Sequence, residues 1–197
     1  MKNDIILSGV GGQGILTIAA AIGMAALESE LYLKQAEVHG MSQRGGSVHS
    51  NLRLSDKEIA SDLIPYGQAD LILSVEPMES LRYLPYLSEN GWLVTNSKPC
   101  INIPDYPDID KIIKEIKKNP NYLILDAVKI ATVLGSPGSA NIIMLGAASL
   151  FIDIAVEYFE KGIQKLFCRK GEEVVKVNID AFHAGRNYAL NKGSSGK

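Results

Sequence analysis

The sequence has few of the residues that build a disulfide framework or a metal site. Its 197 residues include two cysteines and three histidines. Cys100 and Cys168 lie far apart and in no paired motif, whereas an iron–sulfur cluster or a structural zinc generally takes about four protein ligands at short spacings. We therefore expect this chain alone to hold no cluster and no other metal, and we expect no disulfide framework.

An excess of charge of one sign and long apolar runs are also lacking. There are 20 lysines and arginines against 22 aspartates and glutamates, which gives a net charge of −2. This balance argues against nucleic acid as the main partner, because phosphate binding needs a basic excess or a basic face. No apolar run approaches the roughly 20 residues of a membrane span, and residues 1–4 do not resemble a signal peptide. We expect a cytoplasmic protein with neither nucleic acid nor membrane as a partner.

The pattern of apolar residues predicts the fold class. Hydrophobic residues make up 46% of the chain, which is enough for a substantial core. Strand-like and helix-like segments alternate up to residue 125, and the last third is helical with a break near Gly171. This alternation predicts an α/β fold, a three-layer α/β/α domain with a mainly parallel or mixed sheet. We expect a single domain over residues 1–192 and a polar tail over 193–197. Strands are expected over 4–9, 31–38, 48–54, 69–75, 91–96 and 122–126, and helices over 15–27, 78–87, 108–118, 142–151 and 153–190.

The first strand leads into a glycine loop, GVGGQG over residues 9–14, and a helix follows. Glycines allow a tight turn and a close approach of backbone to ligand, and a helix N-terminus stabilises an anion. We expect at least one of Gly11, Gly12 and Gly14 to have a positive φ, and Gln13 to lie in the first helical turn with its amide in the crevice. The candidate cofactor-binding residues are Gly9, Gly11, Gly12, Gln13 and Gly14.

The glycine loop alone leaves three interpretations open. One is a tight strand–helix turn without any ligand. Another is a stand-alone dinucleotide-binding oxidoreductase, for which an acidic residue should follow about 20 residues further on, near the end of strand two. Glu37, which lies 23 residues after Gly14, is a marginal match. The third is a pure scaffold.

A second cluster, EVHGMSQRGGS over residues 37–47, combines charged side chains with glycines beside the end of an expected strand. We expect the first two strands to be neighbours in a doubly wound sheet, so that the loops leaving them converge and this cluster lies near the glycine loop, facing a ligand or a partner. Arg44 is the residue expected to contact an anion. The alternative is a solvated loop with an ion pair between Glu37 and Arg44. The candidate substrate or interface residues are Glu37, His39, Gln43, Arg44, Gly45 and Gly46.

Together, the two motifs resemble the gamma-type domain of 2-oxoacid:acceptor oxidoreductases, most closely the beta subunit of indolepyruvate ferredoxin oxidoreductases. The resemblance extends to ADLILSVEP at 69–77, to NIIMLGA at 141–147 and to NIDAFHAG at 178–185. It covers nearly the whole chain, from about residue 4 to 186.

The resemblance implies a reaction and a partner. In this family an arylpyruvate is oxidatively decarboxylated on thiamine diphosphate, electrons pass through [4Fe–4S] clusters to ferredoxin, and the acyl group goes to coenzyme A. Thiamine diphosphate and the clusters belong to a larger alpha subunit. The chain is then an accessory subunit that carries no catalytic residue and holds no cofactor alone. It would meet ferredoxin through the complex, and when isolated it could form a homodimer.

Overall fold

The computed structural model describes residues 1–39 and 46–193. Six strands form one mixed sheet in the order β2-β3-β1-β4-β5-β6. β1, β4, β5 and β6 run parallel to one another, and β3 runs antiparallel to both of its neighbours. The strands are β1 (Lys2–Val10), β2 (Tyr32–His39), β3 (Ser47–Ser55), β4 (Ala69–Ser74), β5 (Leu87–Asn96) and β6 (Tyr122–Leu125). The expected three-layer α/β fold with a mixed sheet is confirmed.

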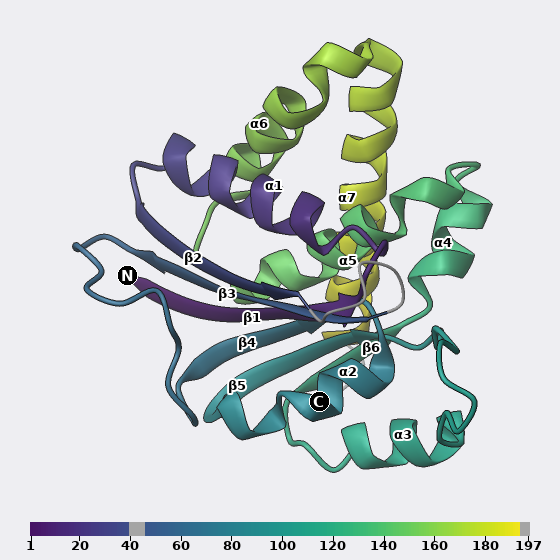
Figure 1. Ribbon diagram of the computed structural model, residues 1–197. Helices are drawn as coiled ribbons and strands as arrows, with labels where there is room; N and C mark the ends of the chain where they lie inside the picture. Colours follow the sequence, from purple (N-terminus) through teal and green to yellow (C-terminus); the bar gives the residue numbers. More distant parts are fainter. Residues whose placement is uncertain (40–45, 194–197) are drawn as a thin grey trace.

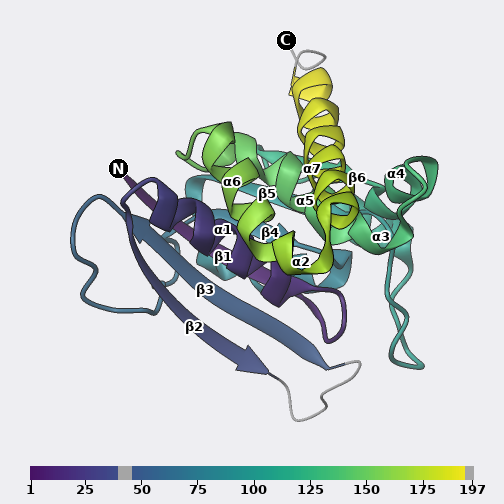
Figure 2. The same ribbon diagram turned by 90° about the horizontal axis from the view of Figure 1, so that it is seen from above.

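Helices cover both faces of the sheet (Figure 1). One face carries α1 (Ile15–Glu28), α5 (Ala140–Ala148), α6 (Val156–Phe167) and α7 (Glu172–Gly193), and the other carries α2 (Pro77–Arg82) and α3 (Ile109–Ile116). α4 (Ala127–Val133) follows β6. Seen from above, β2 and β3 form one side of the sheet beside α1 (Figure 2). None of the helices in the described ranges combines the length and the hydropathy needed to cross a bilayer.

Alternation along β1 builds two cores. Ile5 and Leu7 are buried in the larger core under α1 and α5, whereas Ile6 is buried in the smaller core with Ile72 and Leu93. Successive strand side chains point to opposite faces, so one buried strand serves both layers. β1 is an interior strand, which explains why its sequence is apolar on both faces.

The carboxyl edge of the sheet is where a ligand crevice is expected. The chain leaves β1 for α1 on one face and leaves the adjacent β4 for α2 on the other face. Such a switch between neighbouring parallel strands opens a crevice outside their carboxyl ends. The glycine loop begins at this point.

The strand order corrects one expectation. β1 and β2 are not neighbours, because β3 lies between them and pairs with both, with Val10 opposite Ser47 and Val38 opposite His49. β2 and β3 are consecutive strands that pair as a hairpin, and this pairing displaces β2 to the edge of the sheet.

Two features of the helices also differ from the sequence expectation, the end of α2 and the presence of α4. The helix expected over 78–87 ends at Arg82, a short 3₁₀ turn covers Leu84–Tyr86, and β5 begins at Leu87. Pro85 explains the break, because proline has no amide hydrogen and disfavours a helical residue before it. The second difference is α4, a helix at residues where none is predicted from the sequence. Its start is marked by Asp126, whose carboxylate accepts a hydrogen bond from the Lys129 amide at 2.8 Å.

Candidate functional site

The glycine loop has the backbone that its sequence predicts. Gly12 has a φ of 99° and Gly14 a φ of 81°, so the expectation of at least one positive φ is confirmed. Gly14 is the N-cap of α1 and offers no side chain to the first amides of the helix. Those amides therefore remain available to a ligand at the positive end of the helix dipole.

Two glycines of the loop are also required by their neighbours. A Cβ on Gly9 would lie 2.4 Å from Cγ2 of Val75, and a Cβ on Gly14 would lie 2.3 Å from Nδ2 of Asn141. Both distances are shorter than real Cβ contacts. The Asn141 amide also donates to the Gly14 carbonyl at 3.3 Å. The loop is thus in close contact with Val75, which follows β4, and with Asn141, at the start of α5.

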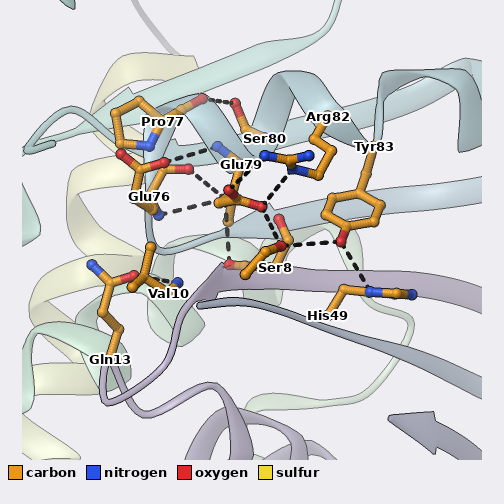
Figure 3. Close-up of polar contacts among 12 residues, drawn as sticks. Ser8, Val10, Gln13, His49, Glu76, Pro77, Glu79, Ser80, Arg82 and Tyr83 are labelled. Carbon is orange, nitrogen blue, oxygen red and sulfur yellow. Dashed lines mark hydrogen bonds and ion pairs between the residues drawn. The ribbon is translucent and has the colours of Figure 1, made fainter. Parts of the chain in front are cut away.

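Gln13 lies before the helix and not in its first turn, which corrects the sequence expectation. Its Oε1 accepts a hydrogen bond from the Val10 amide at 2.8 Å, so the side chain folds back across the loop. Figure 3 shows this contact beside β1. Gln13 still lines the hollow described next, and its amide oxygen is used to fix the turn.

A hollow of about 460 Å³ opens beside the glycine loop. Its floor is formed by the loop, by Val75 after β4 and by Asn96 at the end of β5, and its wall by the start of α5. The N-cap residue of α5, Ser139, gives no side-chain hydrogen bond to the helix, although the Ile142 amide donates to Oδ1 of Asn141 at 2.9 Å. Asn96 and Asn141 line the hollow, and each amide group donates within the chain, to the Val75 carbonyl and to the Gly14 carbonyl. Each NH2 group has a second hydrogen, so the lining suits an anion or a carbonyl-rich group.

The end of the second cluster meets the glycine loop, with Ser47 opposite Val10. The Gly11 amide donates to the Gly46 carbonyl at 2.9 Å. Glu37 and His39 lie on the edge strand β2, where their backbones pair with Ser50 and Val48. Gln43, Arg44 and Gly45 lie outside the described residues.

The strand order also removes the main support for a dinucleotide site. In that kind of site the acidic residue ends the strand next to the first one and contacts the ribose. Here the strand next to β1 is β3, which begins at this edge with Ser47, while Glu37 lies one strand further out. Glu37 is not placed as a ribose ligand.

Comparison with known proteins decides the family. The family model described as pyruvate ferredoxin/flavodoxin oxidoreductase matches residues 4–188. The chain belongs to this family.

Related chains match over almost their full lengths. An indolepyruvate oxidoreductase subunit IorB from Archaeoglobus fulgidus is 34% identical, with 96% of each chain covered. The subunit of the same name from Pyrococcus horikoshii is 37% identical over 92% of this chain and 93% of its own.

A solved gamma subunit of a keto/oxoacid ferredoxin oxidoreductase from Geobacter sulfurreducens has a TM-score of 0.71. It is 26% identical, over 96% of this chain and 99% of its own. A 2-oxoglutarate:ferredoxin oxidoreductase from Magnetococcus marinus, solved with coenzyme A bound, shares the fold with a TM-score of 0.78 at 21% identity. This chain corresponds to 31% of that longer chain.

The Glu-Pro pair by which the chain resembles this oxidoreductase family starts α2. Glu76 is fully buried and is the N-cap of the helix, where its carboxylate accepts from the Glu79 amide at 2.8 Å. The same side chain accepts from the Cys100 amide at 3.3 Å and from the Tyr106 hydroxyl. Burial, together with the Glu76 carboxylate, raises the pKa of Tyr106. Glu76 thus ties the start of α2 to the loop after β5.

A second buried carboxylate was not found from the sequence. Glu79 is 2% exposed; it accepts from the Ser47 hydroxyl at 2.6 Å and from Nε of Arg82 at 3.0 Å. The Tyr83 hydroxyl lies 2.9 Å from Nδ1 of His49 (Figure 3). It also lies 3.4 Å from the Ser47 hydroxyl. These residues are distant in sequence, so spacing could not reveal them, although two glutamates directly after a buried strand were a visible signal.

Proposed function

We propose that this chain is the accessory subunit of a ferredoxin-dependent 2-oxoacid oxidoreductase of the indolepyruvate type, which converts an arylpyruvate to its acyl-coenzyme A. The observation that carries the proposal is the similarity, over almost the full length, to subunits of indolepyruvate oxidoreductases. Relatives named for 2-oxoglutarate are more distant, at 29% identity.

The hollow beside the glycine loop fits an anionic part of coenzyme A. Backbone amides at the start of α1 and the second amide hydrogens of Asn96 and Asn141 would supply donors, and no carboxylate lines the hollow in the described part of the chain. When bound, coenzyme A supplies the thiol that accepts the acyl group. The residues of this chain would bind and orient the cofactor, and Gly12 leaves room for its close approach, because nothing in the described structure lies within 4 Å of a Cβ there.

Thiamine diphosphate and the clusters would be held by a larger partner subunit. The two cysteines, Cys100 and Cys168, are fewer than the four thiolates that a [4Fe–4S] cluster takes. Within residues 1–39 and 46–193, no three side chains of histidine, cysteine, aspartate or glutamate are grouped as metal ligands would be.

Co-expression with a partner that carries the clusters tests the proposal. The expected result is a stable complex that reduces ferredoxin with indolepyruvate only when coenzyme A and both chains are present. A partner that is fully active without this chain would contradict the proposal. So would a nicotinamide-dependent activity of the isolated chain.

A further inference from the structure

A buried carboxylate on the far side of the sheet has no part in the hollow beside the glycine loop. Glu79 belongs to α2, whereas the hollow lies at the α1 and α5 side of the carboxyl edge. Burying a carboxylate is costly unless charge and hydrogen bonds compensate for the lost water. Arg82 binds both of its oxygens, at 3.0 and 3.3 Å. Its remaining described side-chain bond is the one from Ser47.

The bond from Ser47 leads directly to the glycine loop. Ser47 is the first residue of β3 and lies opposite Val10, the last residue of β1. The residue before it, Gly46, accepts the hydrogen bond of the Gly11 amide at 2.9 Å. A carboxylate acceptor at 2.6 Å is a strong, charge-assisted bond. The bond between Ser47 and Glu79 therefore holds the residue next to Gly46 in place.

The loop is held from its own side as well. The Val10 amide donates to Gln13, and the next amide, that of Gly11, donates to Gly46. Two consecutive amides at the start of the turn thus have separate partners, one within the loop and one on the residue before β3. Without the Gly46 partner, this part of the turn would be held by the contacts between Val10 and Gln13 and by the pairing of Val10 with Ser47.

We propose that Ser47 and Glu79 are positioning residues for the glycine-loop site, which they hold in shape from the opposite face of the sheet through Gly46 and Gly11. The identity of the ligand, coenzyme A, rests on the proposed function. The chain of contacts from Glu79 through Ser47 and Gly46 to Gly11 does not depend on that identity.

Hydrogen exchange of the Gly11 amide tests the link without any ligand. Ser47→Ala removes the hydroxyl that anchors β3, and we expect the Gly11 amide to exchange about tenfold faster or more, since one charge-assisted bond is lost. Ser47→Thr keeps the hydroxyl and should restore slow exchange. Ser80→Ala is the matched control, because among the described residues that buried hydroxyl on α2 bonds to the Pro77 carbonyl of its own helix. Wild-type exchange in Ser47→Ala, or equally fast exchange in Ser80→Ala, would overturn the proposal.

Titration of the assembled complex with coenzyme A tests the consequence for binding. We expect Ser47→Ala to weaken binding about tenfold, with the KM for coenzyme A raised and kcat nearly unchanged. Glu79→Gln keeps an acceptor for Ser47 and should have a smaller effect. If it does not fold, Ser47→Ala still decides. A wild-type complex that binds no coenzyme A would contradict the proposed function but not the exchange result. Equal affinity of the wild type and Ser47→Ala would contradict the positioning role.

Discussion

Two groups of glycines serve different purposes in this molecule. At the crossing of α5 and α7, Gly146 and Gly185 allow two helices to touch: a Cβ on either would lie 1.9 Å from a carbonyl oxygen of the other helix. In the glycine loop, Gly12 has a positive φ and open space around its Cβ position. The crossing needs glycine because the backbone of the other helix lies where a Cβ would be. Gly12 is needed for its backbone conformation, and its open Cβ position leaves room for a ligand.

This difference separates the family-like segments at which two helices pack together from the one that lines a hollow. The segments at 141–147 and 178–185 contain the two crossing glycines. In both segments a glycine lies where α5 and α7 touch. The loop at 9–14 lines a hollow of about 460 Å³, so its glycines are the ones to test for binding.

The largest effect is expected at the crossing. Gly185→Ala places a methyl group 1.9 Å from the Ile143 carbonyl, and the two helix backbones must separate. We expect the free energy of unfolding to fall by about 2 kcal/mol or more, because overpacking outweighs the better helix propensity of alanine. Denaturant unfolding measures this change.

Gly138→Ala is the matched control, since Gly138 has an ordinary φ and nothing in the described structure within 4 Å of its Cβ position. That variant should remain within about 0.5 kcal/mol of the wild type. If Gly185→Ala were as stable as the control, the account of the crossing would be wrong.

A smaller effect is expected in the loop, and it should differ between two positions. Gly12→Ala suffers only from its positive φ, which should cost about 1 kcal/mol. Gly14→Ala has the same strain and also a clash with Asn141, so it should cost more. The same unfolding measurement ranks the two variants. Gly14→Ala combined with Asn141→Ala should recover part of the difference, and no recovery would show that the clash is unimportant.

The smallest effect on the free energy of unfolding is expected from protonation of His49, whose contact with Tyr83 lies on the α2 face of the sheet. Burial lowers the pKa of His49, and the Glu79 carboxylate opposes this in part. The groups that face His49 from α2 and its end are the Glu79 carboxylate, which Arg82 binds, and the Tyr83 hydroxyl. Arg53 and Asp4 form an ion pair further along the same face.

The unfolded chain, with an ordinary histidine pKa of about 6.5, therefore takes up the proton more readily than the folded chain. The free energy of unfolding should fall as the pH drops below about 6.5. His49→Gln should flatten that part of the pH profile. An identical slope in the wild type and the variant would contradict this prediction.

Much of the fold follows from local sequence signals, and the strand order does not. The apolar run before GVGGQG and the helical pattern after it identify β1, the loop and α1. The position of β3 between β1 and β2 depends on a hairpin whose connection, residues 40–46, is longer than the two-residue turns by which a sequence marks a hairpin. α4 was missed because its seven residues show little periodicity, although Asp126 and Gly135 mark its ends.

The candidate site was predictable where one segment forms it and not where several do. The positive φ values of the glycine loop follow from its own residues. Contacts such as Ser47 with Glu79, or Gly146 with Phe182, join residues 32 or more positions apart. Only the fold brings them together.

The most direct test of the central claim compares coenzyme A binding by complexes that carry Gly12→Ala or Gly146→Ala, at a temperature where both are folded. If the loop glycines serve the ligand and the crossing glycines serve packing, Gly12→Ala should weaken binding about tenfold, because the turn and its amides move. Gly146→Ala should bind as the wild type does. Wild-type affinity in Gly12→Ala would contradict the account and reduce the glycine loop to a strand–helix turn.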